Sequence, residues 1–270
     1  MTKNIFLAAY LGASFFAQAQ NEPLVLPEQT EFYDLIPKIV TPAAKIGDAP
    51  SDAIILFDGK NFDNFMHDVD GAGIKWTLNK DRVLGREYTP EGPPVKWTLN
   101  SDGSMTVKPG TGGIKTKQLF DDCQLHIEWK SPIEPETLKG QKKGNSGIFF
   151  QERYEVQVLN SYKNDTYTNG QAGAVYKQTP PLANICRPMG EWNTYDIIYT
   201  APRFRRNGSQ ERAGMVTVIH NGVVIQNATI IQGSTEYRGA PVIAPHGKGA
   251  IKLQDHDNEV SFRNIWIRPL

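Results

Sequence analysis

The fold is indicated most clearly by residues 144–161, whose sequence is Gly-Asn-Ser-Gly-Ile-Phe-Phe-Gln-Glu-Arg-Tyr-Glu-Val-Gln-Val-Leu-Asn-Ser. In the second half of this stretch, apolar and polar residues alternate strictly. Successive side chains of a β-strand point to opposite faces, so Tyr154, Val156 and Val158 would share one face. The other face would carry Arg153, Glu155 and Gln157. The pattern predicts a strand with one face in a core and one face of charged and amide groups.

Two further stretches repeat this pattern. Residues 125–130 are Leu-His-Ile-Glu-Trp-Lys, and residues 251–256 are Ile-Lys-Leu-Gln-Asp-His. We expect the three strands to form one sheet with a polar, concave face, which is the candidate site. The side chains expected to converge there are Glu128, Arg153, Glu155, Gln157, Gln254 and His256. Further candidates for binding a ligand are His126, Lys130, Asn145 and Tyr176.

Length, composition and charge narrow the class of protein. A chain of 270 residues can be one large β domain. Lys plus Arg and Asp plus Glu each number 29, so no basic field exists to hold a polyanion, which argues against nucleic acid as the main partner. Aromatic residues make up 10%, with Trp, Asn and Gly prominent, which favours an all-β protein that binds sugars.

Short β-like runs separated by turn signals follow one another from residue 54 onward. They are expected at residues 54–57, 75–78, 95–99, 104–107, 113–116, 124–130, 192–199, 215–220, 223–226, 250–254 and 260–268. Asn221-Gly222 predicts a type I′ hairpin turn. The basic segment 202–213 is interpreted as a solvated turn rather than an anion site. Since no long helical periodicity occurs, the prediction is an all-β fold of two packed sheets.

The N-terminus has the features of a signal peptide over residues 1–19. Lys3 precedes an apolar run at 5–16, and Ala17-Gln18-Ala19 fits a cleavage site, so the mature chain is expected to begin near Gln20. The run is too short to span a bilayer, and no cysteine lies near the site to carry a lipid anchor. We therefore expect export, into the periplasm or beyond. Nothing later in the sequence is long and apolar enough for a membrane span.

Residues 20–53 contain five prolines and are predicted to form an extended arm with one short helical turn near 32–35. The main domain would then cover residues 54–270. Cys123 and Cys186 could pair in an oxidising compartment, but two cysteines define no disulfide framework, so their pairing is left open.

No cofactor is assigned from the sequence. Phosphate loops, Gly-x-Ser-x-Gly elbows and His-x-x-x-His pairs are absent. The side chains that could hold a divalent cation, if they met on neighbouring strands, are His126, Glu128, Glu155 and His256. The same groups could equally line a sugar site with hydrogen-bonding partners, so no metal is assigned.

Two glutamates stand out because each lies in mid-strand between large apolar residues. Buried carboxylates are expensive to keep charged, so Glu128 and Glu155 should be either paired or functional. The structural alternative is an ion pair with Arg153 or Lys130. His256 is expected at a strand end, where it could carry protons or simply bond its own turn.

Several motifs together resemble a known family. In order along the chain they are Leu-Phe-Asp-Gly-Lys at 56–60, Gly-Asn-Ser-Gly-Ile-Phe at 144–149, Tyr-Glu-Val-Gln-Val-Leu at 154–159, Leu-Gln-Asp-His at 253–256 and Phe-Arg-Asn-Ile-Trp-Ile-Arg at 262–268. They resemble the 3-keto-disaccharide hydrolase domain family over about residues 54–270. The resemblance implies a concanavalin A-like jelly-roll sandwich, exported by sugar-scavenging bacteria. It also implies action on glycosides first oxidised to a ketone at C3.

The sequence departs from the ordinary retaining glucanases of the same fold. These enzymes carry Glu-x-Asp-x-x-Glu along one strand, whereas residues 155–160 are Glu-Val-Gln-Val-Leu-Asn. Direct double displacement would lack its second carboxylate. A glucanase is therefore disfavoured, and a non-catalytic carbohydrate-binding sandwich remains the main alternative to an enzyme.

A 3-keto substrate needs different chemistry, because the ketone acidifies the hydrogen on C2. A base removes that proton, the enolate expels the substituent on C1 with the help of an acid, and water adds to the double bond. We predict Glu155 as the base and His256 as the acid, with the reverse assignment open and Glu128 as a third catalytic candidate. Arg153, Lys130 or a cation would stabilise the enolate. The sequence does not determine the sugar, the leaving group, the anomer or the oligomeric state.

Overall fold

The computed structural model describes residues 26–69, 74–78 and 84–270. The chain forms two compact units, Met1–Ile39 and Val40–Leu270. The described part of the first unit contains a 3-10 helix, η1 (Pro27–Thr30), and residues 32–35 form no helical turn, so that prediction is wrong. Pro27 opens η1, and proline favours the first position of a helix because its φ is already fixed there. The predicted signal peptide lies outside the described residues and stays a prediction.

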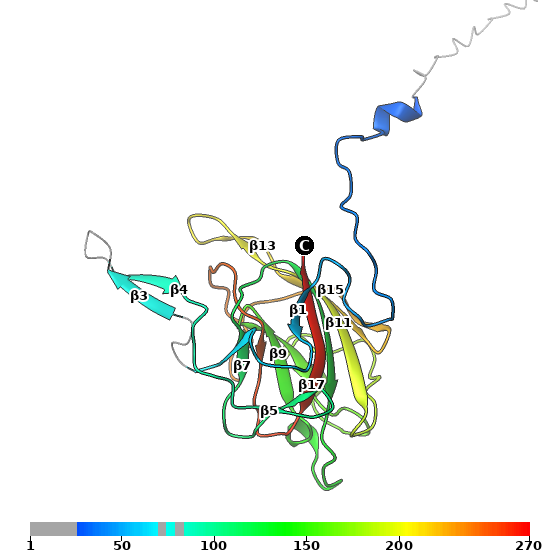
Figure 1. Cartoon of the computed structure of the whole chain (residues 1–270), viewed down its shortest axis with the longest axis vertical. Helices are drawn as coiled ribbons and strands as arrows, with labels where there is room; N and C mark the ends of the chain where they lie inside the picture. Colours follow the sequence, from blue (N-terminus) through cyan, green and yellow to red (C-terminus); the bar gives the residue numbers. More distant parts are fainter. Residues whose placement is uncertain (1–25, 70–73, 79–83) are drawn as a thin grey trace, which may run out of the picture. The chain divides into compact units, whose positions relative to one another are not determined.

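Two antiparallel sheets make up the second unit (Figure 1). The eight-stranded sheet has the order β15 (Val223–Ile230), β14 (Met215–His220), β11 (Trp192–Thr200), β8 (Cys123–Lys130), β17 (Ser261–Pro269), β6 (Met105–Thr106) and β5 (Thr98–Leu99), and β1 (Ile54–Phe57) also pairs with β17. The five-stranded sheet has the order β10 (Tyr154–Val158), β9 (Ser146–Phe150), β16 (Lys252–Leu253), β7 (Ile114–Thr116) and β2 (Phe65–His67). The predicted all-β sandwich is confirmed.

Smaller elements complete the unit. Two-stranded ribbons are formed by β3 (Ile74–Leu78) with β4 (Leu84–Tyr88) and by β12 (Arg203–Phe204) with β13 (Gln210–Arg212). Short 3-10 turns occur at η2 (Gly140–Lys142) and η3 (Thr168–Gly170). The predicted type I′ turn is confirmed, because Asn221 and Gly222 have φ values of +48° and +84°. Strand β2 was not predicted, since its three residues are all buried and show no alternation.

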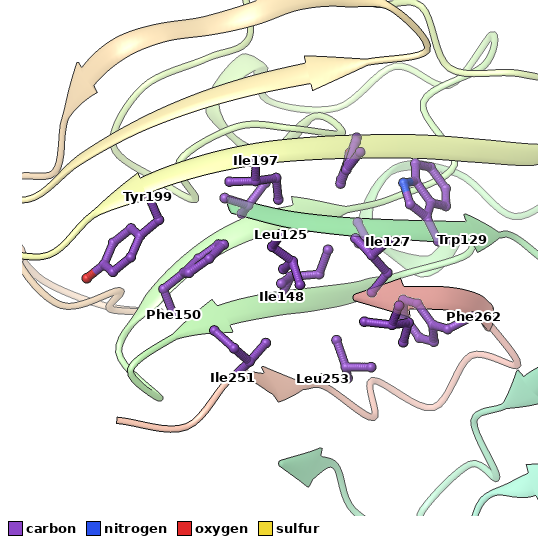
Figure 2. Packing of buried hydrophobic residues seen from close by; sticks show 14 of the residues in the cluster. Leu125, Ile127, Trp129, Ile148, Phe150, Ile197, Tyr199, Ile251, Leu253 and Phe262 are labelled. Atoms are coloured by element: carbon purple, nitrogen blue, oxygen red, sulfur yellow. The ribbon is translucent and has the colours of Figure 1, made fainter. Parts of the chain in front are cut away.

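The core lies between the two sheets (Figure 2). Leu125, Ile127 and Trp129 of β8 point from the larger sheet toward Ile148 and Phe150 of β9 in the smaller one. All five side chains are at most 1% exposed. Burying each such side chain contributes about 1.5–3 kcal/mol, so this alternation is what holds the sheets together.

Strand β8 lies in the larger sheet, while β10 and β16 lie in the smaller one. The prediction that all three share one polar face is therefore wrong. Both sheets direct their apolar faces into the same core, so the polar face of β8 points out of the opposite side of the sandwich. Alternation identified the two faces of each strand correctly but carries no information about which sheet a strand joins.

The outer face of β8 carries a charged cluster in place of a ligand site. The Nδ1 of His126 lies 2.7 Å from Asp196 Oδ1, and Arg263 Nε donates to Glu128 Oε2 at 2.6 Å. Asn264 Nδ2 donates both to Glu128 Oε1 (3.0 Å) and to the carbonyl of Gly47 (2.9 Å). The cluster thus fixes the segment around Gly47 on this sheet, and its role in the fold is structural.

The pKa values of His126 and Glu128 in this cluster are shifted by their neighbours. Burial alone would lower the pKa of His126, but the hydrogen bond and charge of Asp196, with help from Glu128, raise it to about 9. Burial would raise the pKa of Glu128, but hydrogen bonds from His126, Asn264 and Arg263 lower it to about 2. Glu128 is therefore an ion-paired carboxylate, although its partner is Arg263 and neither Arg153 nor Lys130. Lys130 lies over the ring of Trp192, with Nζ 4.7 Å from the centroid.

The basic segment 202–213 forms the β12–β13 ribbon rather than a plain solvated turn. Arg203 approaches Asp121 at 3.3 Å and Asp122 at 2.9 Å, and Arg212 approaches Asp122 at 3.5 Å. Asp121 and Asp122 thus balance the charges of Arg203 and Arg212.

Cys123 and Cys186 are both buried and free, so they form no disulfide with each other. Burial raises the pKa of the Cys123 thiol to about 12 and that of Cys186 to about 11, which keeps both protonated. In the parts of the chain that the structure describes, no helix has the length and apolar character needed to cross a membrane.

The His126 cluster predicts a pH-dependent stability. The folded-state pKa of about 9 lies above the ordinary value of 6.5, so the stabilisation is complete below about pH 6.5 and is lost as the pH rises through 9. Asp196→Asn removes the main partner and should lower the free energy of unfolding at about pH 6 by on the order of 2 kcal/mol, with little effect at about pH 10. Denaturant unfolding at both pH values measures this.

A control for this experiment is Glu211→Gln, which breaks a pair with Arg205 whose side chains are 63% and 58% exposed. Exposed pairs contribute little, so this variant should match the wild type at both pH values. An Asp196→Asn effect of equal size at both pH values would contradict the assignment of a charged His126.

Candidate active site

A cavity of about 280 Å³ lies on the outer face of the smaller sheet. It is lined by Asn145, Phe149, Glu155, Gln157, Tyr176, Thr235, Tyr237, Gln254 and His256. Six of these nine residues are among the ten that the sequence singled out.

Strand register explains why these side chains meet. Glu155 of β10 pairs with Phe149 of β9, and Phe149 pairs in turn with Lys252 of β16. Two residues further along β10, Gln157 pairs with Gly147. The carbonyl of Gly147 accepts a hydrogen bond from the backbone N–H of Gln254 at 3.0 Å. Paired residues on neighbouring strands face the same side of a sheet, so the polar set of β10 and that of β16 form one surface across β9.

Gly147 makes room for the carboxyl group of Glu155. A Cβ on Gly147 would lie 2.4 Å from Glu155 Oε1 and 2.9 Å from a ring carbon of Phe149, closer than real Cβ contacts come. A larger residue at position 147 would therefore displace the carboxyl group of Glu155 or the ring of Phe149 from its present place. The backbone N–H of Glu155 donates to Thr235 Oγ1 at 3.0 Å, which attaches the loop 231–249 to the edge of β10.

The carboxyl group of Glu155 is strongly desolvated, since the residue is only 4% exposed. Burial raises the pKa of Glu155 to about 8, and the nearby positive charge of Lys252 opposes this rise. Lys252 is itself paired with Asp68, its Nζ lying 2.6 Å from Oδ2. A carboxyl group with a pKa near neutrality can both accept and donate a proton, as general acid–base catalysis requires.

The side-chain amide of Gln157 lies beside this carboxyl group. Its Nε2 donates to Glu155 Oε1 at 2.9 Å and to the Ser146 carbonyl at 3.1 Å. This hydrogen bond orients the carboxyl group of Glu155 in the cavity.

Asn145 and Tyr176 are held firmly at the edges of the cavity. Asn145 Nδ2 donates to the carbonyl of Gln141 at 2.8 Å, and its backbone N–H donates to Asn258 Oδ1 at 2.8 Å. The hydroxyl of Tyr176 lies 2.7 Å from that of Tyr167. Burial and this hydrogen bond raise the pKa of Tyr176, so its phenol stays protonated and can donate a hydrogen bond.

The chain matches the 3-keto-alpha-glucoside-1,2-lyase-like domain over residues 52–268. The chain belongs to this family. The resemblance inferred from the sequence motifs is thereby confirmed, since the match spans almost the same residues.

Individual relatives agree with this membership. A 3-keto-disaccharide hydrolase of Bacteroides thetaiotaomicron is 25% identical over 267 residues, covering 80% of this chain and 78% of the relative. A candidate glycosyl hydrolase of Parabacteroides distasonis, known as a crystal structure, superimposes with a TM-score of 0.75 at 47% identity, covering 91% of this chain and 97% of that one. Another from the same species has a TM-score of 0.52 at 20% identity, covers 81% and 94%, and supports the fold alone.

Within this lyase-like domain, the structure brings together part of the predicted site. The cavity contains Asn145, Glu155, Gln157, Tyr176, Gln254 and His256. The remaining predicted residues lie elsewhere: His126, Glu128 and Lys130 are on the outer face of the opposite sheet, and Arg153 is exposed in the turn before β10. The expected convergence of Glu128 and Arg153 with the others is therefore wrong.

The four residues considered for a divalent cation are divided between the two sheets, with His126 and Glu128 on one side and Glu155 and His256 on the other. They cannot hold one ion together. Across the described ranges, no three His, Cys, Asp or Glu side chains are grouped in a way that would hold a metal.

The sequence analysis missed four residues of the site, the cavity-lining Phe149, Thr235 and Tyr237 and the neighbouring Lys252. Thr235 and Tyr237 come from the loop 231–249, which has no periodic pattern that could have located it. Lys252, which acts on the pKa of Glu155 from beside the cavity, did carry a signal, since it has the same strand parity as Gln254 and His256.

Because Glu155 is buried, the stability of the folded protein should depend on the protonation of its carboxyl group. Its folded-state pKa of about 8 exceeds the ordinary value of 4.5, so the folded state retains this proton to a higher pH than the unfolded chain. Stability therefore falls as the pH rises from about 4.5 to about 8 and stays reduced above that. Glu155→Gln should raise the melting temperature at about pH 9 and change it little at about pH 5.

The control for this measurement is Glu136→Gln, whose side chain is exposed and should be neutral at both pH values. Thermal unfolding followed by circular dichroism measures both variants. A Glu155→Gln protein that is less stable than the wild type at about pH 9 would show that the carboxylate has stabilising partners.

Proposed function

We propose that this enzyme cleaves glycosides whose sugar ring carries a ketone at C3, with Glu155 as the base that removes the hydrogen on C2. Family membership and the named relatives support a glycoside-acting enzyme. The observation that carries the finer proposal is the desolvated Glu155 carboxyl group, with a pKa of about 8, at a polar cavity of about 280 Å³. Such a group fits proton transfer near neutral pH.

The proposed reaction proceeds in balanced steps. Glu155 takes the proton from C2, and the electrons of the C2–H bond form an enolate with the C3 ketone. The enolate re-forms the ketone as the C1–oxygen bond breaks, which leaves a double bond between C1 and C2. An acid protonates the departing oxygen, and water then adds across the double bond to complete a net hydrolysis.

His256 is assigned as the acid for the leaving group. Glu155 is buried whereas His256 is exposed in the loop after β16, three residues beyond Leu253, and both line the cavity. The leaving group departs toward solvent, so the exposed residue suits its protonation and the buried one suits the sugar ring. The enolate oxygen would be stabilised by the Tyr176 phenol, which lines the cavity, or by the charge of Lys252, whose Nζ lies 5.6 Å from the ring centroid of the lining residue Phe149. The sequence-based candidates Arg153 and Lys130 do not line the cavity, and Lys130 is on the opposite sheet.

The cavity also supports this route over double displacement. Retaining hydrolysis requires a second carboxylate about 5–5.5 Å from the first. Among the described residues that line the cavity, Glu155 is the only carboxylate. A 3-keto substrate removes the need for the second one, because its C2 hydrogen is already acidic.

The test compares a 3-keto-glucoside with its unoxidised parent. We expect release of the leaving group from the keto form alone, and exchange of its C2 hydrogen with deuterated solvent. Glu155→Gln keeps shape and hydrogen bonding but removes the proton acceptor, so exchange should fall by roughly 10²–10⁴-fold. Nuclear magnetic resonance measures this exchange directly.

The matched control is Arg153→Gln, two residues away on the same chain segment but outside the cavity, which should exchange at the wild-type rate. Exchange at the wild-type rate in Glu155→Gln would remove the role of base from Glu155. Binding of the keto sugar without turnover by the wild type would favour a carbohydrate-binding sandwich, and cleavage of the parent glycoside would favour an ordinary glucanase.

A further inference from the structure

Three tyrosines gather around one lysine at the rim of the cavity. Tyr176 and Tyr237 line the cavity, and the hydroxyl of Tyr167 lies 2.7 Å from that of Tyr176. The Nζ of Lys177 is 4.3 Å from the ring centroid of Tyr237 and 5.8 Å from those of Tyr167 and Tyr176. We call this group, Tyr167, Tyr176, Lys177 and Tyr237, the tyrosine rim.

The tyrosine rim is ordered by bonds between two loops. Lys177 Nζ donates to the carbonyl of Tyr237 at 2.5 Å and so ties the loop 170–190 to the loop 231–249. The Lys177 backbone has φ of +56°, and its N–H donates to the carbonyl of Asn169 at 2.8 Å. The rings are thus positioned before any ligand binds, which lowers the entropy lost on binding.

Two of these rings are nevertheless open to solvent. Tyr237 is 68% exposed and Tyr167 is 41% exposed, although each carries a large apolar face. Fixed aromatic faces at the mouth of a polar cavity are suited to stacking against the C–H face of a sugar ring or against an aryl group. The adjacent Lys177 cation adds a donor for hydroxyl groups at the edge of such a ring.

Cavity size decides which part of the substrate reaches the tyrosine rim. At about 280 Å³ the cavity is at or below the small end of ligand pockets, which span roughly 300–1,000 Å³. The polar groups that would recognise the keto ring, Glu155, Gln157 and Asn145, line the cavity and are at most 4% exposed. With the keto ring against these buried groups, the group attached to C1 would extend toward the exposed tyrosine rim.

We propose that the tyrosine rim is a second subsite, which stacks on the leaving group of the substrate and selects a cyclic leaving group, such as a second sugar, over a small alkyl one. This inference rests on the proposed function, because it takes the keto ring to occupy the base of the cavity.

The test compares two substrates, a 3-keto-disaccharide and a methyl 3-keto-glucoside, in full-length protein. Tyr237→Ala should lower the ratio of kcat/KM for the disaccharide to that for the methyl glycoside by about tenfold. The change should come from a higher KM for the disaccharide. Tyr237→Phe keeps the ring face and should restore the wild-type ratio. Tyr167→Ala should lower the ratio in the same direction.

The matched control is Tyr162→Ala, which removes a tyrosine that also contacts a neighbouring lysine, with Lys163 Nζ 5.3 Å from its centroid, and that does not line the cavity. This variant should keep the wild-type ratio. An unchanged ratio in Tyr237→Ala, or equal losses on both substrates, overturns the subsite while leaving the proposed function intact. Wild-type protein that turns over neither keto substrate overturns both.

Discussion

Strand β10 is buried on both of its faces, and this double burial constrains the rest of the structure. Val156 and Val158 fill the core between the sheets, so Glu155 and Gln157 must point outward. Outward-facing polar groups would ordinarily meet water, but the loops 170–190 and 231–249 bond to this strand through Tyr176 and Thr235. A carboxyl group and an amide are therefore enclosed in a place where the carboxyl lacks an ion-pair partner within salt-bridge distance among the described residues.

The chemistry follows from this enclosure. A carboxyl group without a close counter-charge holds its proton until the pH approaches neutrality, and the neighbouring amide of Gln157 orients it by a hydrogen bond. On the other face of the sandwich, Glu128 has the same alternating sequence context but is paired with Arg263. Two glutamates with similar local patterns thus have opposite pKa shifts, because one has a cation at hydrogen-bond distance and the other does not.

Local pattern predicted the fold class and the faces of the strands, since alternation is a property of each strand by itself. It placed Glu155, Gln157, Gln254 and His256 on one surface, and all four line the same cavity. It could not assign β8 to a sheet, because pairing depends on contacts between residues far apart in the chain. The local pattern could not identify the loop residues Thr235 and Tyr237, because a loop is positioned by the groups it bonds to and carries no periodic signal.

The central claim is that burial holds the pKa of the Glu155 carboxyl group high, while the charge of Lys252 lowers it only in part. A ¹³C nuclear magnetic resonance titration of the Glu155 carboxyl carbon tests it most directly. We predict a pKa of about 8 for Glu155 in the wild type, a higher pKa in Lys252→Met, and a near wild-type pKa in the control Lys252→Arg, because the positive charge lowers the pKa. Titration of Glu155 close to the ordinary glutamate value of 4.5, unaffected by Lys252→Met, would contradict the account.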